Sequence, residues 1–363
     1  MNKKLIALAV AGACVAPAAM AQTANPVTLY GRVHVTFESV EATGAGPLSR
    51  RNRVSDQASL LGVRGTEDLG GGLKAFFQLE TAFKPDQNDS TFAGRNSGVG
   101  LQGGWGSVLL GRWDTPYKVV TTAIDPFGDV TLGGYTAAMN GSGVRGVIGQ
   151  FDRREQNNVQ YWSPNWAGIQ VRLSYMANEG RTAALNPRSN GASVTWTGGP
   201  VYVGYAYHEF KDIALGSIAP LPKQTANQVV GTFAFGPIKL GAGYEEIKRE
   251  GLGTAAVPGF TKHKAWLGNI VWTLGNNQLI YQYSQAKDGE VTVAGTIQPD
   301  CNVNVLGWQY NFTRRTFFLG QYAKVENKNV NSTCNFGSTP GPITTAIGGQ
   351  NPKGISLGLR HIF

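Results

Sequence analysis

Residues 27–38 read VTLYGRVHVTFE, and apolar side chains occupy nearly every second position. Val27, Leu29, Val33 and Phe37 would share one face, and charged or polar side chains the other. A period of two is typical of a β-strand that separates an apolar environment from water. The same alternation recurs along the chain and ends in residues 355–363, ISLGLRHIF. The sequence therefore predicts a succession of amphipathic strands.

The segments that connect these strands alternate between short and long. The short ones carry the Gly and Asn residues that tight hairpins need, at 68–72, 103–106, 164–168, 198–200, 236–237, 275–277 and 313–315. The long ones lie near 39–54, 85–94, 114–152, 179–189, 211–224, 249–262, 287–299 and 327–352. These connections predict an all-β fold, a 16-stranded antiparallel transmembrane β-barrel with short periplasmic turns and long external loops.

The polar face of the strands decides between a membrane barrel and a soluble β protein. A soluble barrel of this size would need a filled apolar interior, whereas the face expected to point inward carries Arg, Lys, Glu, Gln, Thr and Gly. The apolar face must then contact lipid, and a multi-pass position in the outer membrane of a Gram-negative cell follows. Aromatic residues near strand ends fit interfacial girdles, namely Tyr161, Trp162, Tyr175, Trp196, Tyr281, Tyr283, Trp308, Tyr310 and Phe363.

The N-terminus has the features of a secretory signal peptide. Lys3 and Lys4 precede an apolar run that is too short to span a bilayer, and residues 19–21, AMA, form a small-x-small cleavage site. We expect residues 1–21 to be removed and residues 22–363 to form a single barrel domain. A lipoprotein signal ending at Cys14 is the alternative, but residues 11–13 lack the usual aliphatic residue.

The distribution of charge limits the classes of partner that the sequence predicts, and the cysteine content permits a disulfide. The formal net charge of +9 falls to +7 without Lys3 and Lys4, and the basic residues are spread singly along strands. This spacing disfavours nucleic acid and suits a charged interior. Cys301 and Cys334 remain after signal removal, and an exported protein permits a disulfide between them, the alternative being two unpaired thiols.

Motifs that suggest enzymatic chemistry lack the necessary context. Residues 141–146, GSGVRG, fit a dinucleotide fingerprint, but they lie in a long loop rather than between a strand and a helix. The four histidines are far apart, and no serine lies in a nucleophile elbow. We therefore expect no catalytic residues, no metal and no cofactor.

Three stretches resemble the Gram-negative general porins of the β-proteobacterial and neisserial type. They are residues 59–80, residues 99–112 and residues 358–363, and the last ends on Phe363, which resembles a barrel-assembly signal. The resemblance implies a homotrimer in outer-membrane lipid. It also implies that the third loop, residues 114–152 and the longest here, folds into the lumen and narrows it.

The same resemblance suggests which residues line the narrow zone. By position, Arg95 and Arg154 match arginines on the barrel wall of the family, whereas Leu60 replaces another such arginine. Arg32 and Lys74 lie on the polar face of clearly alternating strands. With Asp125 and Asp129 on the third loop as the opposing acids, these residues are the candidates for the pore constriction.

These features predict a diffusion pore for small hydrophilic solutes and ions. The positive charge and the inward basic residues predict a preference for anions. Three alternatives stay open at this point: a substrate-specific anion channel, an adhesive or structural barrel, and an outer-membrane hydrolase.

Overall fold

The computed structural model describes residues 27–87, 89–128, 131–139, 151–215, 218–251, 262–288, 300–330, 332, 334–336 and 348–363. The predicted signal peptide and the 141–146 motif lie outside these residues. Among the residues that are described, no helix has the length and hydropathy needed to cross a membrane.

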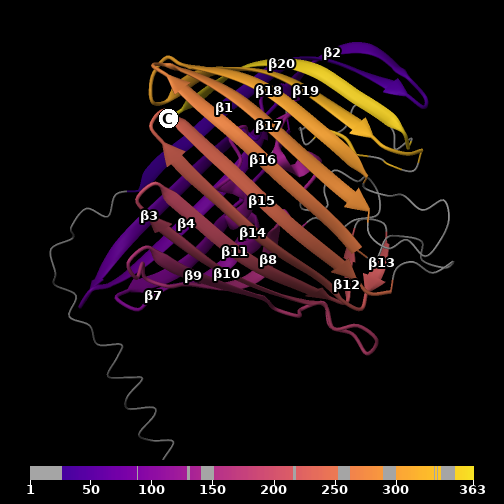
Figure 1. Ribbon diagram of the computed structural model, residues 1–363. Coiled ribbons are helices and arrows are strands. Elements are labelled where there is room, and N and C mark those ends of the chain that lie inside the picture. Colours follow the sequence, from indigo (N-terminus) through magenta and orange to yellow (C-terminus); the bar gives the residue numbers. More distant parts are fainter. Residues whose placement is uncertain are drawn as a thin grey trace, which may run out of the picture.

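Sixteen long antiparallel strands form one closed, tilted wall (Figure 1). Each strand pairs with its neighbours in sequence order, and the last pairs with the first, so the predicted barrel is confirmed. The first eight strands are β1 (Thr28–Gly44), β3 (Leu60–Gly70), β4 (Leu73–Lys84), β6 (Ser97–Gly103), β7 (Gly106–Asp114), β8 (Arg154–Trp162), β9 (Ile169–Met176) and β10 (Arg188–Gly198). The second eight are β11 (Val201–Lys211), β14 (Gln224–Phe235), β15 (Ile238–Arg249), β16 (Lys262–Leu274), β17 (Asn277–Asp288), β18 (Cys301–Asn311), β19 (Thr316–Asn327) and β20 (Gln350–Ile362).

The long loops contain short elements of their own. Most of the predicted first loop, residues 39–54, is strand rather than irregular loop, which corrects the sequence prediction: β1 runs on to Gly44 and pairs with β2 (Leu48–Asp56). The alternation through Val40 continues the strand past the position where the loop was expected to begin. The remaining elements are β5 (Asp89–Thr91), β12 (Ile213–Leu215), β13 (Ile218–Leu221), α2 (Pro116–Thr122) and the 3-10 helix η1 (Tyr135–Ala137).

The chain end closes the barrel. β20 pairs with β1 along thirteen residue pairs, from Arg32 opposite Ile362 to Gly44 opposite Gln350. Phe363 then exchanges two backbone hydrogen bonds with Gly31, each 3.0 Å long. A side chain at Gly31 would collide with the Phe363 ring, so the glycine makes room for the terminal aromatic. The sixteen strands therefore leave no free edge between the first and the last.

The two faces of the wall differ as the alternation requires. Outward residues such as Ile355 and Leu357 are about half exposed, whereas the inward Ser356 between them is buried. The turn between β3 and β4 uses three consecutive glycines, Gly70 to Gly72, all with positive φ, which residues with side chains rarely adopt. An outer apolar surface of this extent needs lipid around it.

A disulfide ties the eighth long loop to the wall. Cys301 at the start of β18 is bonded to Cys334, and their Cα atoms are 6.3 Å apart. Cys334 also lies against Asn327, whose side chain accepts a hydrogen bond from the Cys334 backbone N–H. The bridge closes a chain segment of 33 residues.

Replacing Leu357 by Arg tests the lipid-facing surface. We expect a loss of about 2–4 kcal/mol in the free energy of unfolding, because a guanidinium near the bilayer centre must leave water. The free energy of unfolding is measured by denaturant unfolding in phospholipid vesicles, followed by tryptophan fluorescence. Leu357→Ala is the control and should cost clearly less; equal losses for both variants would contradict a lipid-facing position.

Replacing Cys301 and Cys334 together by Ser tests the bridge. Loop closure of this length contributes roughly 3–4 kcal/mol in the chain-entropy description, but here it constrains the external segment more than the strand ladder. We expect an unchanged far-UV circular dichroism spectrum and faster proteolysis around Cys334. A variant that no longer folds into a barrel would show that the bridge is needed for the wall itself.

Candidate functional site: the lumen and its third loop

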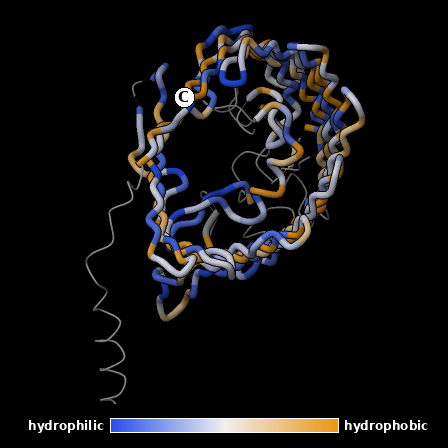
Figure 2. The backbone as a smooth tube through the Cα atoms, turned by 90° about the vertical axis from the view of Figure 1, so that its left-hand side faces the viewer, coloured by the Kyte–Doolittle hydropathy of each residue, from blue (hydrophilic) through white to orange (hydrophobic). Residues whose placement is uncertain are grey.

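The third loop enters the barrel. It begins after Asp114 at the end of β7 and returns at Arg154 at the start of β8, as the sequence predicted. Its helix α2 contacts β9, β10, β11 and β14 from the inside. Seen from the end of the barrel in Figure 2, segments of the chain lie within the ring formed by the wall. The loop therefore reduces the cross-section of the lumen.

Local sequence explains the helix at the start of this loop. Thr115 caps it, its side chain accepting a hydrogen bond from the Lys118 N–H, and Pro116 occupies the first turn, where no N–H is needed. The helix is then fixed to the wall: Tyr117 donates a hydrogen bond of 2.8 Å to Glu245 of β15. Burial, followed by the charge of Glu245, raises the pKa of Tyr117 well above its usual value, so the phenol remains a donor.

The loop continues along the opposite wall, held by side-chain amides. Asn269 of β16 donates to the Ile124 carbonyl, Gln282 of β17 donates to the Gly133 carbonyl, and Gln321 of β19 donates to the Thr131 hydroxyl, at 2.6, 2.8 and 3.2 Å. Because three strands contribute one amide each, the path of the loop is fixed over a large part of the wall.

Apolar contacts strengthen this attachment and correct one expectation. The inward face was expected to be polar throughout, but where the loop covers the wall it carries small and apolar residues. Phe127 of the loop packs over Gly307, where any side chain would collide with its ring. The buried inward residues under the loop are Ala206, Ala226, Val230, Ile247, Ala265, Leu267, Ile280, Val303, Val305, Leu319, Ala323 and Val325. The docked loop replaces water as the neighbour of these residues.

Two of the predicted wall arginines are neutralised by carboxylates. Arg95 lies 2.5 Å from Glu80 of β4, and Arg154 lies 3.3 Å from Asp114. Asp114 is also 3.9 Å from Lys118 of the loop. All these groups are largely buried, and the two pairs that Asp114 forms fix the base of the third loop to the wall. Arg95 and Arg154 therefore add less positive charge to the lumen than their number suggests.

The other predicted residues occupy different places. Arg32 is half-buried and donates to the Ala58 carbonyl at 2.9 Å. Lys74 is exposed beside the short turn that precedes β4, far along the strand from the third loop. Asp125 follows α2 and accepts a hydrogen bond from the Phe127 N–H. Asp129 lies outside the described residues. Of the predicted residues that the structure describes, Arg95 and Arg154 come close together, since Arg154 donates to the side chain of Asn96, and Lys74 lies apart from them.

Three further arginines on inward-facing strand positions were missed by the sequence analysis. Arg64, Arg172 and Arg360 lie over the rings of Tyr30, Trp162 and Phe317, with the guanidinium carbon 4.9, 5.3 and 5.2 Å from the ring centroid. Among the described residues, no carboxylate forms an ion pair with any of the three. Their place on the polar face of alternating strands was a signal that could have identified them.

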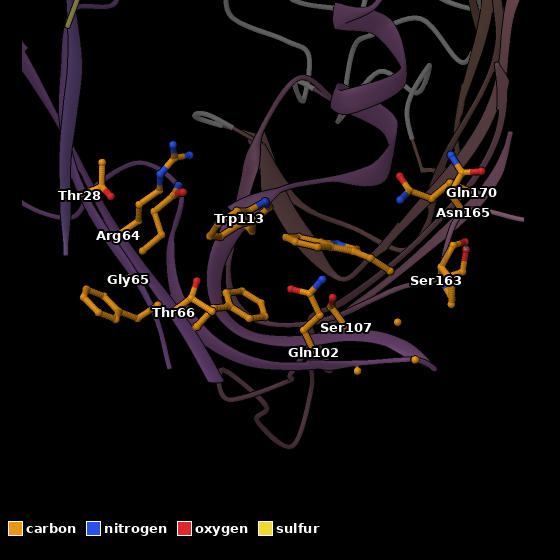
Figure 3. A pocket seen from close by; sticks show the side chains of 18 residues that line it. Thr28, Arg64, Gly65, Thr66, Gln102, Ser107, Trp113, Ser163, Asn165 and Gln170 are labelled. Atoms are coloured by element: carbon orange, nitrogen blue, oxygen red, sulfur yellow. Dashed lines mark hydrogen bonds between the residues drawn. The ribbon is translucent and has the colours of Figure 1, made fainter. Parts of the chain in front are cut away.

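A cavity of about 730 Å³ lies on the side of the lumen nearer the short turns. Figure 3 shows Arg64 and Thr66 on one side of it and Asn165 and Gln170 on the other. Trp162 also lines this cavity, which corrects its expected place in the outer aromatic girdle. Because Trp162 pairs in register with Arg172, it must point to the same inward face.

Buried histidines occupy the wall behind the loop. His208 lies 3.2 Å from Glu155 and His263 lies 3.4 Å from Glu245, with all four side chains inaccessible to solvent. Among the described residues, no cluster of three or more His, Cys, Asp or Glu side chains is arranged to hold a metal ion. The two pairs instead form part of the wall to which the loop is docked.

Comparisons with known proteins agree with this geometry. Residues 7–330 match the sequence profile of the Gram-negative porins. Outer membrane porin protein 32 of Delftia acidovorans is 30% identical over 378 residues, with full coverage of both chains. The major outer membrane protein P.IB of Neisseria meningitidis is 33% identical over 220 residues, which cover 59% of this chain and 61% of that protein.

A solved structure resembles the whole barrel. The anion-selective porin from Comamonas acidovorans superposes with a TM-score of 0.77 at 26% identity, covering 93% of this chain and all of that one. The closed sixteen-stranded wall, the third loop inside it and these matches lead to one conclusion. The protein belongs to the Gram-negative porin family and forms a channel through the outer membrane.

Proposed function

We propose that this porin is an anion-preferring, trimeric pore for the passive diffusion of small hydrophilic solutes. The observation that carries the preference is the way in which Arg64, Arg172 and Arg360 are held. An aromatic ring orients a guanidinium without neutralising it, whereas a carboxylate would cancel its charge. The lumen therefore keeps fixed positive charges at defined positions.

The location of these charges supports the same preference. The third loop contacts the inner side of strands from β9 to β19, so ions pass along the remaining wall and beside α2. Arg64 on β3 and Arg360 on β20 belong to that wall, and Arg172 on β9 lies at its edge, next to α2. Selectivity in a water-filled pore depends on rings of charged residues and on pore width. Here the part of the wall that the third loop leaves open carries these three arginines.

The outer surface supports a trimer. Exposed Trp and Tyr side chains lie on β9, β10, β11 and β16 to β19, where they suit a lipid interface; they are Tyr175, Trp196, Tyr205, Trp266, Trp272, Tyr281, Tyr283, Trp308 and Tyr322. The exposed large side chains on β20, β1, β3, β4, β6 and β7 are instead aliphatic, apart from Phe37. Apart from Trp105 and Phe363 at the short-turn rim, this face has no exposed interfacial aromatics among the described residues, which suits contact with other protomers.

Planar-bilayer recordings under a salt gradient test both parts of the proposal. We expect conductance steps that arrive in threes and a reversal potential of anion-selective sign. Replacing Arg64, Arg172 and Arg360 together by Gln should lower the anion-to-cation permeability ratio about fivefold or more, because one unit charge about 4 Å from an ion in water contributes roughly 1 kcal/mol.

The matched control replaces the same three arginines by Lys, which keeps the charge. It should retain most of the preference, since the charge rather than the guanidinium geometry acts on small ions. Cation selectivity of the unaltered protein would refute the proposed preference. Single conductance steps from a protein that is monomeric by light scattering would refute the trimer.

Replacing Phe127 by Ala tests whether the docked loop defines the open pore. Removing a buried phenylalanine costs about 3–5 kcal/mol at the contact, so the loop should leave the wall more often and the open-channel current should become noisier. Phe37→Ala is the control, because Phe37 is half exposed on the outer face of β1. Unchanged noise in Phe127→Ala would mean that the hydrogen bonds alone hold the loop.

A further inference from the structure

Aromatic rings gather at one place on the inner wall. Phe76 of β4, Trp113 of β7 and Trp162 of β8 line the cavity near the short turns and are half-buried. The centroid of the Trp162 ring lies 5.4 Å from that of Trp113 and 6.3 Å from that of Phe76. We call these three residues the aromatic shelf. The lumen of a porin barrel is otherwise polar, so the shelf favours a solute that carries an apolar face of its own.

The surrounding wall holds these rings in place. Gly100 pairs in register with Phe76, and a side chain at Gly100 would collide with the Phe76 ring. Trp162 donates a hydrogen bond of 2.9 Å from its indole N–H to the Gln160 side chain. The guanidinium of Arg172 lies 5.3 Å from the centroid of the Trp162 ring. Because the rings are fixed before a solute arrives, little side-chain entropy is lost when one binds.

The charge around the shelf is positive only. Arg64 is an exposed side chain of the cavity, and no Asp or Glu is among the described residues that line it. Arg172 lies at the edge, where it donates two hydrogen bonds, of 3.2 and 3.1 Å, to the Gln170 side chain, which lines the cavity itself. Figure 3 shows Trp113 between Arg64 on one side and Gln170 on the other. A guanidinium fork matches the planar geometry of a carboxylate.

Rings and charge together select one class of solute. A small inorganic anion would pair with Arg64 but would leave the rings in contact with water. A neutral sugar could lie on the rings, but it brings no charge to the guanidinium. A flat ring that carries a carboxylate uses both surfaces at once. The cavity volume of about 730 Å³ is within the range of small-molecule sites, roughly 300–1,000 Å³.

We propose that the aromatic shelf is a binding site for aromatic carboxylates of the benzoate type as they cross the pore. The proposal rests on the proposed function as an anion-preferring pore, and it names the class of organic anion that the pore holds. The solute ring lies against the three rings of the shelf, and its carboxylate pairs with Arg64. Binding is weak and reversible, because a pore conducts only solutes that also leave it.

Titration of the pore current with matched acids tests this proposal. Benzoate is added to planar bilayers in potassium chloride at neutral pH, and the conductance should fall to a plateau as the site fills. Cyclohexanecarboxylate has the same charge and a similar size but no aromatic face, so its half-saturating concentration should be on the order of fivefold higher. Benzyl alcohol, which has the ring without the charge, should bind more weakly than benzoate. Equal half-saturating concentrations for the two acids would overturn the proposal.

Variants of the shelf show where the two acids are distinguished. Trp113→Leu combined with Trp162→Leu should make their half-saturating concentrations equal. Phe76→Leu alone, a milder change, should reduce the difference and serves as the test if the double variant does not assemble. The matched control is Trp272→Leu, on the outer face of β16, which should keep the full difference. A preference for benzoate that survives both shelf variants would overturn the proposal.

The same recordings separate this site from the ion preference of the pore. The shelf variants change no charge, so the reversal potential in a potassium chloride gradient should stay as in the unaltered protein. Arg64→Gln should raise the half-saturating concentrations of both acids by a similar factor. A cation-selective pore that still prefers benzoate would refute the proposed ion preference and support the shelf. An anion-selective pore that treats both acids alike would refute the shelf alone.

Discussion

Backbone groups that lie in hydrocarbon must find their hydrogen-bond partners within the protein, and the pairing of β20 with β1 meets this constraint for the last open edge. The terminal Phe363 and the side-chain-free Gly31 extend that pairing to the end of the chain. Once the wall is closed, every second residue must face either lipid or the interior. Closure of the barrel therefore creates the inner surface, and the function of the pore depends on which side chains and loop segments lie on that surface.

The third loop divides that inner surface into two parts. Where it docks, the wall carries Gly307, Val305 and other small or apolar residues, and three amides bind its backbone. Where it does not dock, arginines remain in contact with water. The loop thus narrows the pore and also determines which wall the ions encounter. A sheet with uniform inward polarity could not have held the loop in one place, since water would compete for every contact.

The sequence predicted the wall well because its period of two is enforced at each strand by lipid on one side. Strand number, turns and the inward course of the third loop all follow from this regularity and from the family resemblance. Trp162 was misplaced because an aromatic near a strand end fits either face, and only its register with Arg172 shows that it points inward. By alternation Lys74 shares one face of β4 with Gln78 and Glu80, but alternation contains no information about height along the pore.

Ion pairing separates the arginines predicted from family position from the three arginines that lie over aromatic rings. Arg95 and Arg154 meet Glu80 and Asp114, residues distant in sequence whose proximity depends on strand register. The net charge is also a poor guide to the field in the pore, because it counts cations on both faces of the wall. The formal net charge of +9 combines arginines held by rings inside the barrel with lysines that face outward at its external rim. Only the first group lies where a permeating ion can sense it. The field in the pore is therefore set by which cations lack a carboxylate on the inner wall, a property of the folded register and not of composition.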